Sequence, residues 1–524
     1  MTRQVTLDVE SSTPPLTLLI IAPVVEPRHS VALLVESLVA QWTGNWRLVI
    51  VGHSAVSPVA DPRITVIEND SHDLAALVVT ALAAETGDYV MIAPHDGSFP
   101  DNAMSIVGSY LADEPDIDIV YTDEGIERGG RQTPRLVPKP AYSPERLRSQ
   151  FYIGDCVFYR RSLLQAVDGL RSSFPGAELY DLALRATLSA SRIEHYSEAL
   201  FIRGIGAGVP GEIRGEVAVN STRLALEQHL ALTGGGVVDE VRETGLHRTR
   251  RPVIGEPLVS IVIPTRGGHG DVRGVKTCMI LEAVASVLDT STYTNIELVV
   301  VMDDVVDSDV VAQLRELAGD KLTLVWWTSA FNFSAKVNFG AYHSRGEYLL
   351  FLNDDTEVIS PDWIEAMLAL AQLPRAGMVG AMLYFEDGTI QHAGHIYEGG
   401  DAGHIGTNLP RGIDGPFGSF RIDREIAGVT AACSMVATKV FEEAGGFSLL
   451  LPGNFNDVDL CMKIAELGHQ SYWTPRAELY HYESKTRIPR VSRYEVETAW
   501  GRWEWKLHDR AFWPYGVWAN NLIG

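Results

Sequence analysis

Short runs of hydrophobic residues alternate along the chain with longer stretches in which hydrophobic residues recur every three or four positions. The short runs have the length of buried strands, and the longer stretches, such as 31–41 and 74–84, have the periodicity of helices. In the first half, the predicted strands are 16–22, 46–51, 89–92 and 117–121. Strands that alternate with helices are typical of a parallel α/β sheet.

The same order of elements starts again at Leu258. The predicted strands of the second half are 258–263, 297–301, 322–326 and 348–352, and the predicted helices include 275–288 and 310–317. Four segments of this half match segments of the first half in the same order, for example IELVVVM (296–302) with WRLVIVG (46–52). An ordered series of matches indicates an internal repeat, so the sequence predicts two tandem α/β domains.

Changes in composition suggest where the domains begin and end. The first α/β domain is predicted at 1–210 and the second at 258–490. Between them, 211–257 contains a helix that ends at three glycines, followed by a polar, arginine-rich linker with two prolines. The tail, 491–524, is rich in aromatic residues. We expect it to pack across the second domain, with acceptor binding or membrane contact as the alternative.

Composition and charge narrow the possible partners. Of the 524 residues, 46% are hydrophobic and 21% are charged, which is typical of globular domains. The net charge of −24 repels nucleic acid, so no nucleic-acid partner is expected, and any membrane contact needs a local basic patch. The four cysteines form no CxxC pair, the N-terminus lacks the apolar core of a signal peptide, and no apolar run reaches the roughly 20 residues that span a bilayer. A cytoplasmic protein, with at most peripheral membrane contact, is therefore predicted.

Two carboxylates directly follow one predicted strand of the second domain. Asn353, Asp354 and Asp355 come after 348–352, and ligands bind at the carboxyl ends of parallel strands. Adjacent carboxylates offer hard oxygen ligands for Mg²⁺ or Mn²⁺, which can in turn bind a diphosphate. A solvated turn or a helix cap would account for the same residues without chemistry.

Further polar residues fit such a site. Asp457 lies at the start of a predicted helix, where a carboxylate acts either as a cap or as a general base for an attacking hydroxyl. His481 follows a short strand and would either complete the coordination of a metal or be structural. Thr265, Asp303 and Asp304 follow the first two strands, where they would bind a nucleobase or ribose or simply form turns.

A third group of candidate ligands lies in the segment QHAGHIYEGGDAGH. It contains His392, His395 and His404 within 13 residues. The segment has no cysteine and no clean ligand spacing, so the sequence argues against a zinc site there.

Taken in order, these residues resemble the family 2 glycosyltransferases. The motifs are SIVIPT, VVVMDD, FNFSAKVN, FLNDDTEVISPDW, QHAG, GFSLLLPGNFNDVDLC and ELYHYES. The resemblance covers nearly the whole chain, is strong over 258–490, and is greatest to tandem-domain bacterial enzymes of O-antigen and cell-surface polysaccharide assembly. It implies two tandem GT-A-like, Rossmann-like α/β domains, a nucleotide-diphosphate sugar donor (UDP- or dTDP-linked), a glycan or lipid-linked glycan acceptor, Mn²⁺ or Mg²⁺ as cofactor, and inversion at the anomeric carbon.

The resemblance also implies a role for each matching residue. Asp457 would be the catalytic base, and Asp355, Asp354 and His481 would hold the metal. The residues expected to bind the nucleotide sugar are Thr265, Asp303, Asp304, Lys336, Asn353 and Arg487. The residues expected on the acceptor side or in supporting positions are Asp459, Cys433 and His392.

Two positions depart from the family pattern. Asn456 stands where a glutamate usually precedes the base, and Ala431 stands where a glycine is common. The floor of the acceptor site is therefore not predicted.

The first domain keeps the strand pattern but loses most of the chemical groups. By position it has Val24 for Thr265, His53 and Ser54 for Asp303 and Asp304, and Pro94, His95 and Asp96 for Asn353, Asp354 and Asp355. The base position falls near Leu179 and the metal histidine near Ile202. We therefore predict a degenerate, catalytically inactive first domain. The alternative is that it binds a different donor without metal, through Asp96 and Asp181.

Two other functions compete with glycosyl transfer. A non-catalytic carbohydrate-binding or assembly subunit with a relic active site is disfavoured, because the second domain retains the metal, base and nucleotide residues. A nucleotidyltransferase usually needs a glycine-rich phosphate loop after the first strand, and the one candidate, 266–270, lacks a lysine. The donor sugar and the acceptor hydroxyl are not predicted by the sequence.

Overall fold

The computed structural model describes residues 16–26, 30–53, 55–129, 133–205, 211–483 and 491–515. The chain divides into two compact units that interleave in sequence. Unit 1 comprises residues 1–142, 150–229 and 241–245, and unit 2 comprises 143–149, 230–240 and 246–524. A mixed β-sheet forms the centre of each unit.

Unit 1 is built on an eight-stranded sheet in the order β3-β2-β1-β4-β7-β5-β6, with β8 beside β5. Its strands are β1 (Leu18–Val24), β2 (Trp46–Gly52), β3 (Ile64–Glu68), β4 (Tyr89–Ile92), β5 (Ile119–Ile126), β6 (Arg135–Val137), β7 (Val157–Arg160) and β8 (Ile193–Arg203). Its helices are α1 (Ala32–Val39), α2 (Leu74–Ala84), α3 (Ala103–Asp113), α5 (Arg161–Ala166), α6 (Glu178–Ser189) and most of α7 (Gly215–Leu232). The first four strands are parallel, as the α/β pattern predicts.

Unit 2 is built on a ten-stranded sheet in the order β15-β14-β11-β16-β23-β18-β24-β17, with β19 beside β18 and β22 beside β24. Its strands are β11 (Val259–Thr265), β14 (Ile296–Asp303), β15 (Leu322–Trp327), β16 (Tyr348–Leu352), β17 (Thr356–Val358), β18 (Ala376–Tyr384), β19 (Ile390–His392), β22 (Arg424–Ile426), β23 (Cys433–Ala437) and β24 (Gln470–His481). Three hairpins join β9 (Val237–Glu240) to β10 (Arg248–Arg250), β12 (His269–Val272) to β13 (Val275–Cys278), and β20 (His395–Glu398) to β21 (Asp401–His404).

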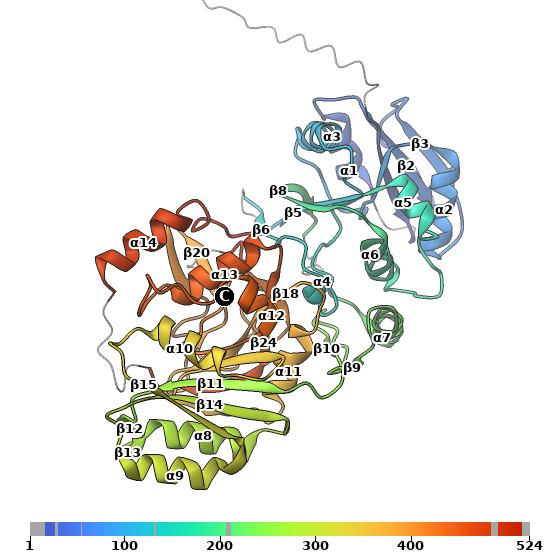
Figure 1. Ribbon diagram of the computed structural model, residues 1–524. Coiled ribbons are helices and arrows are strands. Elements are labelled where there is room, and N and C mark those ends of the chain that lie inside the picture. Colours follow the sequence, from blue (N-terminus) through green and yellow to red (C-terminus); the bar gives the residue numbers. More distant parts are fainter. Residues whose placement is uncertain are drawn as a thin grey trace, which may run out of the picture. The chain divides into compact units, whose positions relative to one another are not determined.

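The helices of unit 2 lie on both faces of this sheet. They are α4 (Pro144–Leu147), α8 (Met279–Thr290), α9 (Ser308–Ala318), α10 (Phe333–Tyr342), α11 (Trp363–Ala371), α12 (Thr438–Glu443), α13 (Asn456–Glu466) and α14 (Arg493–Trp503), with 3-10 turns at Gly319–Lys321 and Pro416–Gly418. In Figure 1, α8 and α9 lie together on one side of β11 and β14, and α10 lies on the other side.

Alternate side chains of β11 explain this three-layer arrangement. Ile261 and Ile263 are buried in the core cluster that includes α8 and α9. Val262 points into the other cluster, which includes Val337 of α10. Because successive side chains of a strand point to opposite faces, a continuous apolar run is buried on both faces of the sheet.

The two sheets share one strand order. The series β3-β2-β1-β4-β7-β5 of unit 1 corresponds to β15-β14-β11-β16-β23-β18 of unit 2, and β8 runs parallel to β5 as β24 runs parallel to β18. The registers correspond as well, since Leu18 pairs with Tyr89 and Val259 pairs with Tyr348. The repeat in the sequence is thus matched by a repeat in the topology.

One predicted helix begins later than its pattern indicated. Residues 275–278 form β13, which pairs antiparallel with β12, so α8 starts at Met279 and the predicted start at 275 is wrong. The partner strand β12 contains Gly270 and has no apolar run, so nothing in the local pattern indicated the hairpin. Pairing with a neighbouring strand overrides local helical periodicity here.

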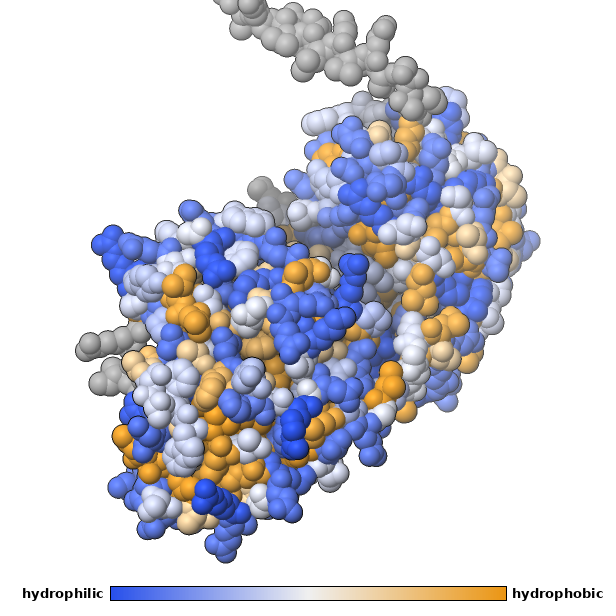
Figure 2. All heavy atoms as spheres, viewed as in Figure 1, coloured by the Kyte–Doolittle hydropathy of each residue, from blue (hydrophilic) through white to orange (hydrophobic). Residues whose placement is uncertain are grey.

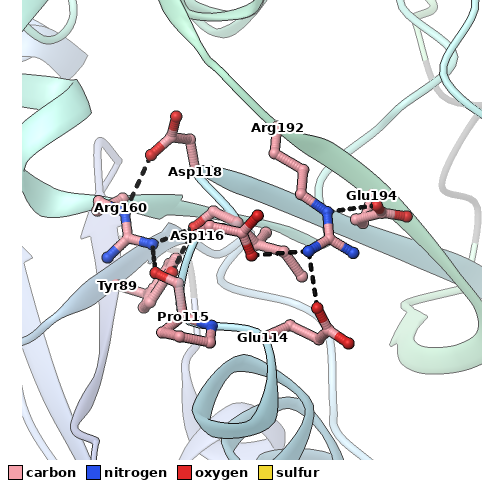
Figure 3. Close-up of polar contacts among 9 residues, drawn as sticks. Tyr89, Glu114, Pro115, Asp116, Asp118, Arg160, Arg192 and Glu194 are labelled. Carbon is pink, nitrogen blue, oxygen red and sulfur yellow. Dashed lines mark hydrogen bonds and ion pairs between the residues drawn. The ribbon is translucent and has the colours of Figure 1, made fainter.

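Ion pairs hold the loop that leads into β5 of unit 1 (Figure 3). Arg192 contacts the carboxylates of Glu114 and Asp116 at 2.7 Å and that of Glu194 at 2.8 Å. Arg160 contacts Asp118 at 3.0 Å and donates to the main-chain oxygens of residues 115 and 117. These side chains are partly exposed, and pairs of this kind contribute roughly 0 to 1 kcal/mol each. We assign them the role of fixing the loop.

The described part of the C-terminal tail packs on unit 2. The helix α14 begins with a capping box, in which Ser492 and Glu495 hydrogen bond reciprocally. Farther along, Trp513 and Tyr515 are buried in the core cluster that also contains Trp473. Trp513 and Tyr515 thus extend the core of this unit, whereas Tyr494, Trp500 and Trp505 are exposed.

A buried carboxylate ties α14 to α13. Asp459 is fully buried and accepts a hydrogen bond from the indole of Trp503 at 2.9 Å. Arg502 lies 3.0 Å from this carboxylate and Lys463 lies 3.3 Å from it. The charge of Asp459 therefore has two cationic partners and one hydrogen-bond donor.

The face shown in Figure 2 is mainly hydrophilic, with hydrophobic side chains gathered in smaller patches. Among the helices of the described residues, none has both the length and the apolar composition needed to cross a membrane.

We predict that Asp459→Asn lowers the free energy of unfolding by about 1 to 3 kcal/mol, because it removes the charge that faces Arg502 and Lys463. Urea denaturation of the full chain measures this loss. Glu466→Gln on the same helix is the matched control, since Glu466 pairs with Lys506 but its side chain is 52% exposed. Equal stability of Asp459→Asn and the control would contradict a structural role for Asp459.

Candidate active site

A cavity of about 410 Å³ lies at the carboxyl ends of β11 and β16 in unit 2. Seven of the residues predicted for the active site line it: Thr265, Lys336, Asn353, Asp354, Asp355, Asp457 and His481. They come from the ends of three strands and the first turns of α10 and α13. The edge of a parallel sheet brings together residues that lie far apart in the sequence.

The closest charged pair in the cavity is Asp355 and His481. The antiparallel pairing of β17 with β24 places Thr356 opposite His481, and the amide of Tyr482 donates to the carbonyl of Asp355 at 2.9 Å. The Nε2 atom of His481 lies 3.2 Å from Oδ1 of Asp355. Burial alone would lower the pKa of His481, but the Asp355 carboxylate outweighs burial and raises it.

Gln391 orients the imidazole of His481. Its Oε1 atom lies 2.6 Å from Nδ1 of His481, and its amide nitrogen donates to the carbonyl of His481 and to Glu483. Since an amide oxygen only accepts, Nδ1 carries the proton and Nε2 faces Asp355. This arrangement, in which the second ring nitrogen is held by a buried partner, is the one found in metal-ligating histidines.

Asp354 is the second carboxylate of the cavity. Its Oδ2 atom accepts a hydrogen bond from the hydroxyl of Thr265 at 2.5 Å. Burial, followed by repulsion from Asp355, raises the pKa of Asp354 to about 7. Two adjacent carboxylates that resist simultaneous ionisation, with an imidazole nitrogen beside them, form a donor set that fits Mn²⁺ or Mg²⁺.

Lys336 links the ends of β11 and β14. Its ammonium group donates to the carbonyl of Thr265 and to Oδ1 of Asp303, both at 2.5 Å. Burial lowers the pKa of Lys336, although Asp303 opposes this effect. Asp303 thus lies beside the cavity as the partner of Lys336, whereas Asp304 is exposed. The structure brings Asp303 to the site but not Asp304.

Asp457 lies in the first turn of α13 and lines the same cavity. Its Oδ2 atom accepts from the amide of Ala431 at 3.1 Å, and its Oδ1 atom accepts from the amide of Val458 at 2.9 Å. The side chain of Asn456, at the position where the family has glutamate, accepts from the amide of Asp457 at 2.8 Å. Two main-chain amides therefore hold the carboxylate of Asp457 in place. Neither of these contacts comes from a cationic side chain.

Three predicted acceptor-side or supporting residues lie outside the lining of the cavity. Asp459 anchors α14, as described above. Cys433 is buried in β23, where burial raises the pKa of its thiol. His392 is buried beside two other histidines. Arg487, predicted to face the diphosphate, lies outside the described residues.

Several lining residues were not predicted from the sequence. They are Arg266, Phe331, Phe333, Thr430, Asn454 and Glu483. Gln391 was missed too, although it stands directly before His392 in the QHAG motif. The phenylalanines belong to the FNFSAKVN motif, so this motif was the available signal for them.

Unit 1 has different chemistry at the corresponding positions. Asp96 lies seven residues after Tyr89, as Asp355 lies seven residues after Tyr348. Arg203 is the last residue of β8, as His481 is the last residue of β24. The sequence placed this position near Ile202, which is one residue away.

Arg203 and Asp96 line a cavity of about 550 Å³ in unit 1, and Arg203 pairs with Asp155 at 3.0 Å. A guanidinium group always carries its proton and does not ligate metals. Asp181 is buried between Arg171 and Arg185, with Arg185 at 2.7 Å. Both arginines pair with the carboxylate of Asp181. This pairing argues against the alternative in which Asp96 and Asp181 together bind a donor in unit 1.

The family of the second half follows from comparison with known proteins. Residues 260–445 match the family model described as glycosyl transferase family 2. The resemblance inferred from the motifs is therefore confirmed over these residues. The predicted α/β class, with a parallel run of strands at the start of the sheet, is confirmed by the structure itself.

Curated relatives extend over more of the chain. An uncharacterised protein, y4gI of Sinorhizobium fredii, is 32% identical over 94% of this chain and 56% of its own length. The O-antigen biosynthesis protein RfbC of Myxococcus xanthus is 31% identical over 89% of this chain and 38% of its own length. The chain thus spans about half or less of the length of these two relatives.

Solved structures show weaker similarity. A crystal structure of S. aureus TarS is 16% identical, covers 40% of this chain and 39% of TarS, and has a TM-score of 0.30. A crystal structure of GalNAc-T7 with UDP, GalNAc and Mn²⁺ is 13% identical, covers 50% of this chain and 51% of GalNAc-T7, and has a TM-score of 0.38.

The raised pKa of Asp354 makes the stability of the metal-free protein depend on pH. In the folded state the pKa of Asp354 is about 7, whereas the ordinary value of an aspartate is 3.8. The folded state therefore binds more protons than the unfolded state between these values, and ionisation of Asp354 destabilises the fold as pH rises. The penalty is complete above about pH 7.

We predict that Asp354→Asn stabilises the metal-free protein at pH 8 by about 1 to 3 kcal/mol and leaves its stability at pH 4 almost unchanged. Thermal melting in the presence of a chelator measures both values. Asp304→Asn, on the exposed neighbour of Asp303, should have no effect at either pH. A gain that is equal at the two pH values would show that the buried charge of Asp354 is not its cause.

Proposed function

We propose that unit 2 is a metal-dependent, inverting glycosyltransferase that acts in cell-surface polysaccharide synthesis. It takes a sugar from a nucleotide-diphosphate donor, UDP- or dTDP-linked, and transfers it to a hydroxyl of a glycan or lipid-linked glycan. The observation that carries this proposal is that a metal-ligand set and an isolated carboxylate share one cavity. The metal-ligand set is Asp355 with His481, and the carboxylate is Asp457.

The donor end of the cavity would hold the diphosphate. Asp355, His481 and Asp354 would bind Mn²⁺ or Mg²⁺, and the cation would stabilise the negative charge of the leaving diphosphate. Asn353 and Thr265 offer hydrogen bonds beside it, and Lys336 fixes the ends of the two strands that frame the nucleotide. Metal dependence is supported by the donor set and by the like charges of the adjacent carboxylates.

Asp457 would act at the acceptor end as the general base. The amides of Ala431 and Val458 hold its carboxylate in the cavity. As the acceptor hydroxyl attacks the anomeric carbon, Asp457 accepts its proton. Direct displacement in one step inverts the anomeric centre. None of the lining side chains that we assign to this reaction acts as a covalent nucleophile.

The relatives support the place of this reaction in the cell. One is an O-antigen biosynthesis protein. Another, 25% identical over 147 residues, is an N-acetylglucosaminyl-diphospho-decaprenol L-rhamnosyltransferase of Mycobacterium tuberculosis. The four free cysteines, three of them buried, fit a reducing cytoplasm. We therefore place transfer in the cytoplasm, at the inner face of the membrane when the acceptor is lipid-linked.

Unit 1 would be inactive in transfer. It has a permanent cation, Arg203, where unit 2 has its metal-ligating histidine, and it has Leu179 near the position of the base. Its cavity would then serve in packing, orientation or acceptor binding.

We predict that Asp457→Asn reduces kcat by a factor of about 100 to 10,000, because the acceptor proton loses its base. Release of UDP or dTDP from a panel of nucleotide sugars, with Mn²⁺ and a glycan acceptor, first identifies a working donor for the wild type. The same assay then gives kcat, and calorimetry with that donor checks that its affinity is retained.

The matched control is Asp96→Asn, which changes the corresponding carboxylate of unit 1 and should leave transfer intact. Full activity of Asp457→Asn would refute the assigned base. Loss of activity in Asp96→Asn would indicate that transfer takes place in unit 1. If no nucleotide sugar is consumed by wild type, the competing proposal, a non-catalytic carbohydrate-binding subunit, would take precedence.

A further inference from the structure

Three histidines of unit 2 that the proposed transfer does not use converge beside the cavity. His395 and His404 face each other directly across the β20–β21 hairpin, and His392 ends β19 three residues before His395. The ring centroids are 4.6 Å apart for His392 and His404, 5.2 Å for His392 and His395, and 5.3 Å for His395 and His404. One ring nitrogen from each lies within 4.8 Å of the other two.

The main chain fixes this geometry. The amide of His395 donates to the carbonyl of Gly428 at 2.8 Å, which ties the hairpin to the segment before Thr430. The amide of Ala393 donates to the carbonyl of Ile405 at 3.0 Å, and the amide of Ile405 donates to the carbonyl of Gly394 at 2.9 Å. Directly opposite residues of an antiparallel pair project from the same face of the ladder, so His395 and His404 present their rings side by side.

Two buried nitrogens of this cluster have no hydrogen-bond partner. They are the Nδ1 atoms of His392 and His395, whose side chains are 0% and 2% exposed. Buried polar atoms are nearly always satisfied, and an orphaned one requires a cause such as a ligand. His404, at the end of β21, is exposed and gives access to the cluster.

Charged groups of both signs surround the cluster. The carboxylate of Asp457 interacts with His395 and His404, and that of Glu483 interacts with His404. Arg424 acts in the opposite sense on His392. The guanidinium of Arg424 donates hydrogen bonds to the carbonyls of Ser419 and Ala393. His481 acts in the same sense as Arg424, on both His392 and His404. Two negative groups thus face two positive groups around the cluster.

We propose that His392, His395 and His404 form a binding site for Zn²⁺ or a chemically similar borderline cation, separate from the carboxylate site for Mn²⁺ or Mg²⁺. Imidazole nitrogen suits zinc, copper and nickel, whereas carboxylate oxygen suits magnesium and manganese. Three protein ligands leave a fourth position for water. This site goes beyond the proposed transfer, which does not need it.

The separation of the nitrogens defines the movement that binding requires. At the usual Zn–N length, two ligands of a tetrahedral site lie about 3.3 Å apart, so the wider separations must shrink by up to about 1.5 Å. Rotation of the exposed His404 side chain shortens its separations from His392 and His395, and rotation of the His392 and His395 rings adjusts the remaining one.

Ligation by His392 competes with an existing hydrogen bond. Its Nε2 atom accepts from the amide of Thr430 at 3.2 Å, which places the proton of the neutral ring on Nδ1. A cation at Nε2 displaces the Thr430 amide, and a cation at Nδ1 requires the proton to move. His395 and His404 are therefore the two principal ligands, and His392 is the third.

The test uses the full chain carrying Asp355→Asn, which disables the carboxylate site and leaves the histidines intact. After treatment with a chelator, this protein is titrated with Zn²⁺ by calorimetry and with Co²⁺ by visible absorption, which reports a low-symmetry nitrogen site. We expect one equivalent of Zn²⁺ to bind. In the same background, His404→Ala and His395→Ala should each weaken binding at least tenfold, whereas His343→Ala, which removes an exposed histidine of unit 2, should have no effect.

The proposal is overturned if the Asp355→Asn protein binds no Zn²⁺ at micromolar concentrations, or if both histidine variants bind it as tightly as their parent. Because His404 is exposed, His404→Ala should fold normally even if His395→Ala does not, and melting curves check this. The result does not depend on whether unit 2 transfers a sugar.

Discussion

The pairing of the short strand β17 with the end of β24 is the constraint on which the site of unit 2 depends. Asp355 lies directly before β17, and His481 is the last residue of β24, so this pairing alone joins a carboxylate to an imidazole 126 positions away. Gln391, on β19, then fixes the imidazole by its Nδ1 atom. Asp354 lies beside the like charge of Asp355 and accepts one hydrogen bond from Thr265. A divalent cation would offset the repulsion between the two carboxylates.

The two units share one strand order but differ in the polar residues at the ends of their strands. Both have the same strand order, and both end the corresponding strand at the edge of a cavity. In unit 2 that strand ends in a histidine that can share a metal. In unit 1 it ends in Arg203, whose charge is permanent and is already paired with Asp155. Unit 1 thus keeps the strand order and the core while the polar residues at its strand ends differ from those of unit 2.

Much of the fold could be predicted from the sequence, because buried parallel strands are local apolar runs and their order was repeated. The strand ends also led to Asp355 and His481, and the start of a predicted helix led to Asp457. The errors have physical causes. The hairpin of β12 and β13 is a pairing between short segments without apolar runs. The register of β8 depends on pairing with distant residues, including the bridge between Ser98 and Ile202. The three histidines looked poorly spaced for a metal along the chain, yet cross-strand pairing places His395 opposite His404.

The most direct test of this account asks whether a nucleotide binds only through the metal pair of unit 2. The thermal stability of the full chain is measured with UDP and with dTDP, each with and without Mn²⁺, for the wild type and for Asp355→Asn. A ligand at 100 times its dissociation constant adds about 2.7 kcal/mol of stability, which is visible as a shift in melting temperature. The account predicts that one nucleotide stabilises the wild type only with Mn²⁺, and that Asp355→Asn abolishes the shift. An equal shift in Asp355→Asn, or no shift in the wild type with either nucleotide, would contradict it.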